Sequence, residues 1–189
     1  MNLYPIALFL HVSGAIIYLF GIGTRLLVLT IQRGARRVEQ VRALAPFIEL
    51  SGPLSGIGLL LILVTGFYMA MTAWGLFTGW IVVTLISLVL VVPAGIAVME
   101  PGRRAIDRLA REAPDGPLTE PLVRRIHDPV HVTALQTLTL VLLGIVFLMT
   151  NKPSLTISLI VMGVALALGL ASGALKSWRR WPTRAVPAS

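Results

Sequence analysis

Residues 79–99 read GWIVVTLISLVLVVPAGIAVM, and this stretch contains no charged side chain. A helix rises about 1.5 Å per residue, so a stretch of this length crosses the roughly 30 Å hydrocarbon core of a bilayer. Pro93 lies near its end and predicts a kink there. Four further apolar stretches lie around it, at about residues 3–31, 53–73, 130–150 and 154–175. The sequence therefore predicts an all-α membrane protein, a bundle of five transmembrane helices with a four-helix core and an additional C-terminal helix.

The composition of the chain supports a membrane location. Hydrophobic residues make up 56% of the 189 residues, charged residues only 13%, and the mean hydropathy is +0.87. Soluble domains carry about 25% charged residues, so lipid must cover much of this chain. The sequence contains no cysteine, which excludes disulfides, thiolate metal sites and iron–sulfur clusters. Haem and copper stay open, because His and Met are ligands of both.

Basic residues gather in the segments between the apolar stretches. Of the 16 basic residues, all except Arg25 and Lys152 fall on one side of the membrane when the helices alternate in direction. The positive-inside rule makes that side the cytoplasm, with the N-terminus outside and the C-terminus inside, and we expect the inner (plasma) membrane of a bacterium. This rule also explains the net charge of +8. The expected partner is therefore the lipid bilayer and not nucleic acid, and a second copy of the chain or a membrane complex stays open.

The predicted organisation is one membrane core with an addition. Residues 1–153 form the four-helix core, with cytoplasmic loops at about 32–50 and 100–129, and residues 154–189 form the fifth helix and a basic tail. Within the longer loop, Pro101 suits the first turn of a helix, and apolar residues recur at helical spacing behind it. This pattern predicts a short amphipathic helix that lies on the inner membrane surface.

Small and polar residues indicate which helix faces meet other helices, because Leu and Val do not discriminate between lipid and protein. On the first helix, residues spaced three and four apart form one stripe that we expect to face the bundle: His11, Gly14, Tyr18, Gly21 and Arg25. Snorkelling toward the inner headgroups explains Arg25 without a functional role. Two further pairs have the Gly-x-x-x-Gly spacing of close helix packing: Gly52 with Gly56, and Gly169 with Gly173.

His11 is the leading candidate for a functional residue, because an ionisable side chain inside a membrane helix is costly. Three interpretations stay open: a neutral histidine bonded to a neighbouring helix, a ligand of haem b or copper, and a proton relay. Tyr18, on the same stripe, is a second candidate for cofactor binding. Thioethers in the same half of the membrane are further candidate metal ligands: Met69, Met71 and Met162, with Met149 nearby.

His127 and His131 have the spacing of two metal ligands on one helical face. Pro129 argues against this interpretation, because Asp128 as N-cap and Pro129 as the first helical residue leave His127 outside the helix. By helix rise, His131 is about 16 Å from His11 in depth, too far to share one haem with it. No hydrolase, kinase or dinucleotide-binding motif occurs, so no catalytic residue is assigned and an enzyme is not expected.

The stretch LHVSGAIIY at residues 10–18 resembles the opening of a family of predicted bacterial integral membrane proteins of unknown function, which is similar to the copper-resistance D membrane domains. Trp74 and Trp80 around the second turn, the arginine-rich third loop and the end of the fourth helix agree with the resemblance, which covers about residues 3–153. The resemblance implies copper or haem as the ligand of His11. The chain departs from a multi-histidine pattern, because only His11 lies within the membrane core.

Three hypotheses about function follow. The first is a non-enzymatic membrane protein that binds haem b or copper through His11, in electron transfer or metal handling. The second is a structural or accessory subunit of a membrane complex that binds no ligand. The third is a small permease, against which the shortage of charge in the spans counts.

Overall fold

The computed structural model describes residues 3–178, apart from the side chains at 173, 174 and 176–178. Each regular element in this range is a helix: α1 (Tyr4–Gln32), α2 (Val38–Arg42), α3 (Ala45–Met69), the π-helix η1 (Ala70–Trp74), α4 (Gly79–Glu112), α5 (Glu120–Ile126), α6 (Pro129–Asn151) and α7 (Leu155–Trp178). This confirms the all-α prediction. The rest of the predicted basic tail, residues 179–189, lies outside the described residues.

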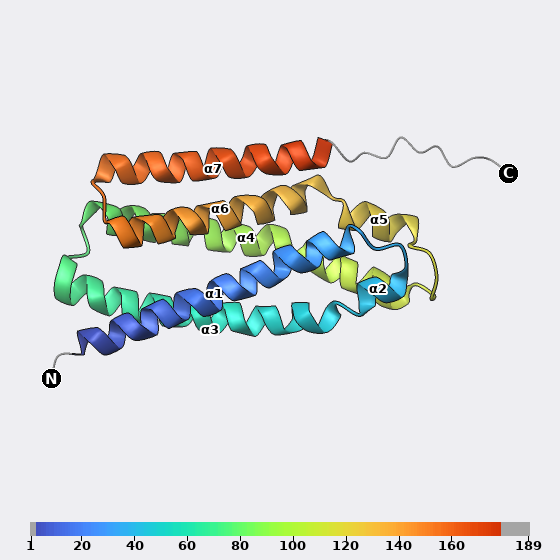
Figure 1. The fold of residues 1–189 in the computed structure, drawn as a ribbon, viewed down its shortest axis with the longest axis horizontal. Coiled ribbons are helices and arrows are strands. Elements are labelled where there is room, and N and C mark those ends of the chain that lie inside the picture. Colours follow the sequence, from blue (N-terminus) through green and yellow to red (C-terminus); the bar gives the residue numbers. More distant parts are fainter. Residues whose placement is uncertain (1–2, 179–189) are drawn as a thin grey trace.

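The long helices run side by side along one axis, as Figure 1 shows. α1 packs against α3, α4 packs against α6, and α7 covers the other side of α6. Within the described residues, five helical segments are long and apolar enough to cross a membrane, which confirms the predicted number of spans. The molecule thus has an α1–α3 pair and an α4–α6–α7 group, and the two parts meet along a seam.

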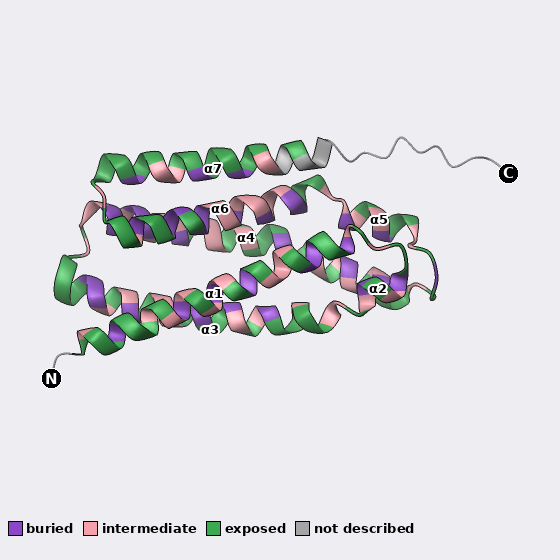
Figure 2. Cartoon of the chain, viewed as in Figure 1, coloured by how far each residue is buried: buried purple, intermediate pink, exposed green. Residues whose placement is uncertain are grey.

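The outer surface of the bundle is apolar. Figure 2 shows exposed residues along the outward sides of the long helices. Several of these are large hydrophobic side chains, such as Phe9, which is 70% exposed, and Leu90, which is 65% exposed. Water does not tolerate so much exposed hydrocarbon on a monomer, whereas lipid does. The interior between the two parts is filled by apolar side chains from α1, α4 and α6, with Tyr18, Leu88 and Leu135 among them.

The α1–α3 pair crosses closely at small residues. A Cβ added to Gly58 would lie 2.6 Å from the backbone nitrogen of Tyr18 and 2.8 Å from the carbonyl oxygen of Gly14. Further along α1, Gly21 lies similarly close to Ser51 and Ser55 of α3. The stripe predicted on the first helix therefore faces α3, as expected.

The glycine pairs differ in what they contact. Gly56 is exposed and has no neighbour within 4 Å of an added Cβ, while Gly52 has only the Arg25 guanidinium at 3.7 Å. α3 instead contacts α1 closely through a neighbouring face, at Ser51, Ser55 and Gly58. The hydroxymethyl side chain of serine is small enough to allow the two helices to approach as closely as at a glycine. Gly169 does pack closely, with an added Cβ only 2.5 Å from Thr137 Cα. Gly173 lies in α7, but its surroundings are outside the description.

α4 is longer than a membrane crossing requires and corrects one expectation. Its 34 residues give a length of about 50 Å and continue through both Pro93 and Pro101. The segment 101–112 is therefore not a separate helix on the membrane surface. It continues α4 outward because Ile106 and Ala110 pack against α2 and α5 instead of lipid.

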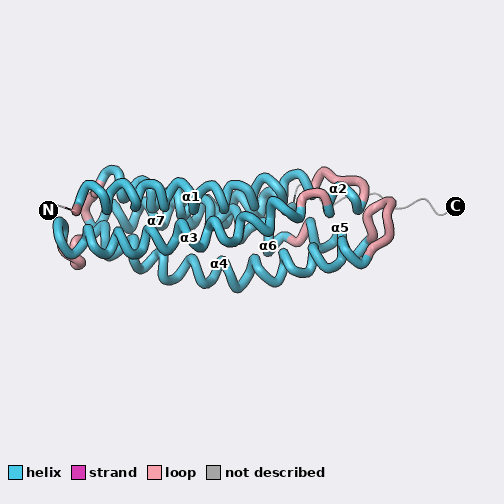
Figure 3. Tube along the Cα trace, turned by 90° about the horizontal axis from the view of Figure 1, so that it is seen from below, coloured by secondary structure: helices cyan, strands magenta, loops and turns pink. Residues whose placement is uncertain are grey.

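The two predicted loops fold into a second small core, which we call the arginine-rich end: α2, α5 and residues 100–112 of α4. Figure 3 shows these elements gathered at one end of the bundle. Val38, Val41, Leu122 and Ile126 are fully or almost fully buried there. Helices this short are unstable alone, so their packing on α4 holds them.

Arg42, at the end of α2, links that helix to the end of α4 and to the loop that follows it. Its guanidinium donates to the carbonyl oxygens of Ala110 at 2.8 Å and Ala113 at 2.6 Å, and forms an ion pair with Asp115 at 2.6 Å. These are carbonyl groups that the end of α4 leaves without helical partners. Arg42 therefore caps α4 as well as contributing to the charge bias.

Candidate functional site around His11

A cavity of about 340 Å³ lies along the seam at the end of the bundle that carries Trp74 and Trp80, which we call the tryptophan end. α1, α3, η1, α4 and α6 all contribute side chains to its walls, which are mostly apolar. Its volume is within the range of small-molecule sites, and such sites combine apolar walls with a few polar groups. His11 on α1 is one of these polar groups.

The hydrogen bonds of His11 define its tautomer. Nδ1 lies 3.1 Å from the carbonyl oxygen of Ile62 and 3.2 Å from Oγ1 of Thr65. A carbonyl oxygen only accepts, and the Thr65 hydroxyl already donates to the carbonyl oxygen of Leu61. Nδ1 must therefore carry the hydrogen and donate it, which leaves the lone pair on Nε2. No described residue forms a hydrogen bond with Nε2.

Gly66 makes space for the imidazole. A Cβ at this position would lie 2.9 Å from His11 Cε1 and 3.2 Å from Nδ1, inside van der Waals distance. Any larger residue at 66 would displace the ring from Ile62 and Thr65. α3 thus positions the imidazole through the Ile62 carbonyl and the Thr65 hydroxyl, and Gly66 leaves the space that the ring needs.

The opposite wall of the cavity contains an unsatisfied hydroxyl. Thr84 on α4 is 1% exposed and lines the cavity, and its Oγ1 has no hydrogen-bond partner among the described residues. Most buried hydroxyl groups have a partner, so an unpaired one beside a cavity is a position where a ligand gains a contact.

Aromatic side chains and one cation form the end wall of the cavity. Trp74 and Trp80 meet edge to face with ring centroids 5.8 Å apart, and Lys152 Nζ lies 4.3 Å from the centroid of Trp74. The Trp74 indole also donates to the Tyr4 hydroxyl at 3.3 Å. Lys152 adopts a left-handed conformation, φ 49°, directly after α6, and this directs the chain into the turn before α7.

The structure brings only part of the predicted set together. Met69 lines the cavity with His11, and so does Met149. Met71 is exposed, Met162 of α7 packs against Gly144 of α6, and Tyr18 is buried in the core between the helices. Among the described residues, no group of three or more His, Cys, Asp or Glu side chains forms a cluster able to hold a metal ion.

Sequence reasoning assigned no role in this site to Thr65, Gly66 or Thr84. The adjacent Thr and Gly at 65–66 were the available signal, since a small residue beside a hydroxyl on a membrane helix marks a polar contact. The π-helix η1 was also missed. It ends α3 with a wider turn, closed by the Gly75 N–H donating to the Ala70 carbonyl at 2.7 Å, and it contributes Ala70 and Trp74 to the cavity.

The other histidines are elsewhere. His127 donates from Nδ1 to the carbonyl oxygen of Val123, 3.0 Å away, and lies just before α6. Asp128 caps α6 through its carboxylate, which accepts from Val130 N–H at 2.9 Å, and Pro129 is the first helical residue, as predicted. His131 lines a different cavity, at the arginine-rich end.

Comparison with known proteins identifies one related family. The model of a family described as predicted integral membrane protein (DUF2269) matches residues 5–153. Comparison with curated proteins and with solved structures gave no match. The matched residues include the whole wall of the His11 cavity except Tyr4, whereas α7 lies beyond the match.

Proposed function

The chain belongs to this family of predicted integral membrane proteins, and on that premise we propose that it is a non-enzymatic protein that binds haem b through Nε2 of His11, in electron transfer. The observation that carries the proposal is the fixed tautomer of His11. A histidine that ligates a metal almost always donates its other ring N–H to a carbonyl or carboxylate, and Ile62 provides that acceptor here.

The residues of the cavity fit haem b in two respects. The walls are mostly apolar, as a macrocycle requires. Lys152 is the one cationic side chain among the lining residues, and it suits the carboxylate of a propionate group. When bound, the haem supplies one-electron redox chemistry, while His11 holds and orients it and the apolar walls exclude water.

Copper is the second candidate ligand, in metal handling, and the thioethers favour it. Met69 and Met149 line the same cavity as His11. One imidazole nitrogen with soft thioether sulfur atoms is a donor set that Cu(I) prefers. The two candidates share His11 and differ in whether the methionines are required.

The test is a visible absorption spectrum and an elemental analysis of the detergent-solubilised full-length protein. We expect a Soret band, or copper in stoichiometric amount, that is lost in His11→Leu and retained in His127→Leu, a matched histidine outside the cavity. Met69→Leu with Met149→Leu should abolish copper and leave a Soret band that depends on His11 alone. Wild-type protein with neither signal would refute the ligand site and leave the structural-subunit hypothesis.

The orientation is part of the same proposal. We place the arginine-rich end in the cytoplasm and the His11 cavity in the outer half of a bacterial inner membrane, because every basic residue of the described loops except Lys152 lies at the arginine-rich end. A fluorescent protein fused after Ser189 should then be fluorescent, and a periplasm-dependent phosphatase fused there should be inactive. Active phosphatase and a dark fluorescent fusion would reverse the orientation.

A further inference from the structure

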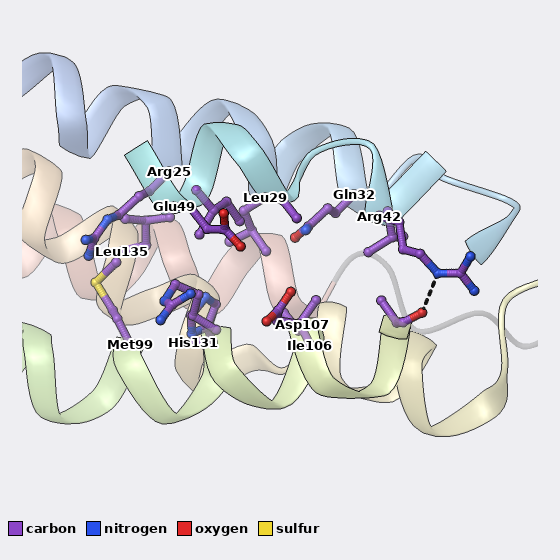
Figure 4. Close-up of a pocket in the computed structure, with 15 residues that line it drawn as sticks. Arg25, Leu29, Gln32, Arg42, Glu49, Met99, Ile106, Asp107, His131 and Leu135 are labelled. Carbon is purple, nitrogen blue, oxygen red and sulfur yellow. Dashed lines mark hydrogen bonds between the residues drawn. The ribbon is translucent and has the colours of Figure 1, made fainter. Parts of the chain in front are cut away.

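A second cavity, of about 50 Å³, lies along the same seam at the arginine-rich end. α1, α2 and α3 line one side and α4 and α6 the other, as Figure 4 shows. The polar residues that line it are Arg25, Gln32, Arg42, Glu49, Arg103, Asp107 and His131. None of them belongs to the His11 cavity.

Most charges in this cavity are already paired. Arg42 pairs with Asp115, and Arg103 pairs with Glu100 at 2.6 Å. Glu49 and Asp107 share Arg111, at 2.9 and 3.1 Å. These ion pairs leave one charge in the lining without a partner, the guanidinium of Arg25.

The position of Arg25 is fixed from one side only. Its Nε donates to Ser51 Oγ at 3.1 Å, and the Ser51 hydroxyl donates to the Ile48 carbonyl at 2.7 Å. No carboxylate lies within ion-pair distance of Arg25 among residues 3–178, and Glu100, which acts on it from further away, is held by Arg103 and Arg104. Arg25 lines the cavity, and in Figure 4 its guanidinium points away from Arg42 and the arginine-rich end.

His131 provides a second, independent observation. It is 8% exposed and lines the cavity from α6, yet its Nδ1 has no hydrogen-bond partner among the described residues. Gly102 on α4 leaves space for this ring, because an added Cβ there would lie 3.1 Å from Cε1 of His131 and closer still to the unpaired nitrogen, at 2.5 Å. A buried, unpaired imidazole beside an unpaired guanidinium is a costly arrangement unless a ligand completes it.

We propose that this second cavity binds an oxyanion, a phosphate or carboxylate group, with Arg25 as the main ligand and His131 as an additional donor. The terminal guanidinium nitrogens of Arg25 match the geometry of two oxygens of such a group, and Nε stays bonded to Ser51. The lining carries three guanidinium groups against two carboxylates, and this excess of positive charge favours an anion over a cation or a neutral molecule. The group comes either from the headgroup of an anionic phospholipid or from a free anion at the arginine-rich face.

Two probes separate these sources. Delipidated full-length protein in detergent is titrated with inorganic phosphate by calorimetry, and protein in nanodiscs of phosphatidylglycerol or of phosphatidylcholine is unfolded by heat. The variants are Arg25→Gln, the charge-conserving Arg25→Lys, and Arg108→Gln as a matched control, since Arg108 is exposed on α4 and outside the cavity.

We expect Arg25→Gln to weaken binding by about tenfold or more, from the loss of a charge-assisted contact, and Arg25→Lys to weaken it less. Arg108→Gln should bind within about twofold of wild type, which separates a specific contact from general charge attraction. Binding of phosphate in detergent identifies a free anion, and a higher midpoint only in phosphatidylglycerol identifies a lipid headgroup. No response to either probe, or equal losses in Arg25→Gln and Arg108→Gln, would overturn the proposal, which stands independently of haem or copper at His11.

Discussion

The crossing of α1 and α3 gives a sharp prediction, because its cost follows from three distances. In Gly58→Ala, the new Cβ would lie 2.6, 2.8 and 2.9 Å from Tyr18 N, Gly14 O and Tyr18 Cα. Ordinary carbon contacts are about 3.5–4.0 Å, so the two helices must separate by roughly 0.6–1 Å. All three obstacles are backbone atoms, which no side-chain rotation relieves.

We expect a cost toward the upper part of the overpacking range, about 2–3 kcal/mol. Alanine recovers about 1 kcal/mol of helix propensity relative to glycine, so the net loss is about 1–2 kcal/mol. Gly56→Ala is the matched control, two residues away on the same helix with nothing within 4 Å of its new Cβ, and should be neutral or stabilising by up to about 1 kcal/mol. Because the propensity gain is common to both, their difference of about 2–3 kcal/mol measures the clash alone.

The assay is reversible unfolding in mixed micelles of dodecylmaltoside and SDS, followed by circular dichroism. His11 is one turn from Gly14 on α1, and separation of the helices also lengthens its bonds to Ile62 and Thr65. Gly58→Ala should therefore weaken any ligand at His11 as well, while Gly56→Ala should not. Equal stability of the two variants, within about 0.5 kcal/mol, would refute the close backbone crossing.

Three further predictions concern residues in or next to the arginine-rich end. Arg42→Met should lower the stability of this end by about 2 kcal/mol, because the carbonyl groups of Ala110 and Ala113 lose a partly exposed charged donor, and limited proteolysis after Glu112 should accelerate. Asp128→Ala should cost about 1 kcal/mol through loss of the α6 N-cap, measured by thermal unfolding, with Asp128→Asn retaining most of the stability. Glu39, on α2 outside the membrane, has its pKa lowered from 4.5 to about 2 by Arg37, so it stabilises this end above pH 4.5, and protection of its amides in hydrogen exchange should fall as pH approaches 2. Glu39→Gln should remove that dependence on pH, and an unchanged profile would contradict it.

The five spans follow from the sequence because hydrocarbon tolerates only apolar side chains, as the uninterrupted stretch at 79–99 shows. The sequence also predicts which face of the first helix packs against protein, because a histidine and two glycines lie on that face at helical spacing. The sequence does not predict which face of α3 these residues contact. Ser55 and Gly58 make the contact on α3, and no pattern within the sequence alone distinguishes their face from that of Gly56.

The second core is the part that sequence reasoning could not reach. α2 is five residues long and α5 seven, too short for a reliable periodic signal, and their burial depends on α4 continuing past Pro101. The same limit applies to the candidate site. His11 was found from its cost in a membrane, whereas Thr84 and Lys152 join it only through the arrangement of three other helices.

α4 lines both cavities, with Thr84 at one and Arg103 at the other, and runs unbroken between them for most of its length. A ligand that rotated or shifted α4 at one cavity would change the shape of the other cavity. Thermodynamic linkage makes such an influence mutual and equal in free energy. Binding of a ligand at one end of the bundle would then change the affinity for a ligand at the other end, without any charge, electron or solute passing between them.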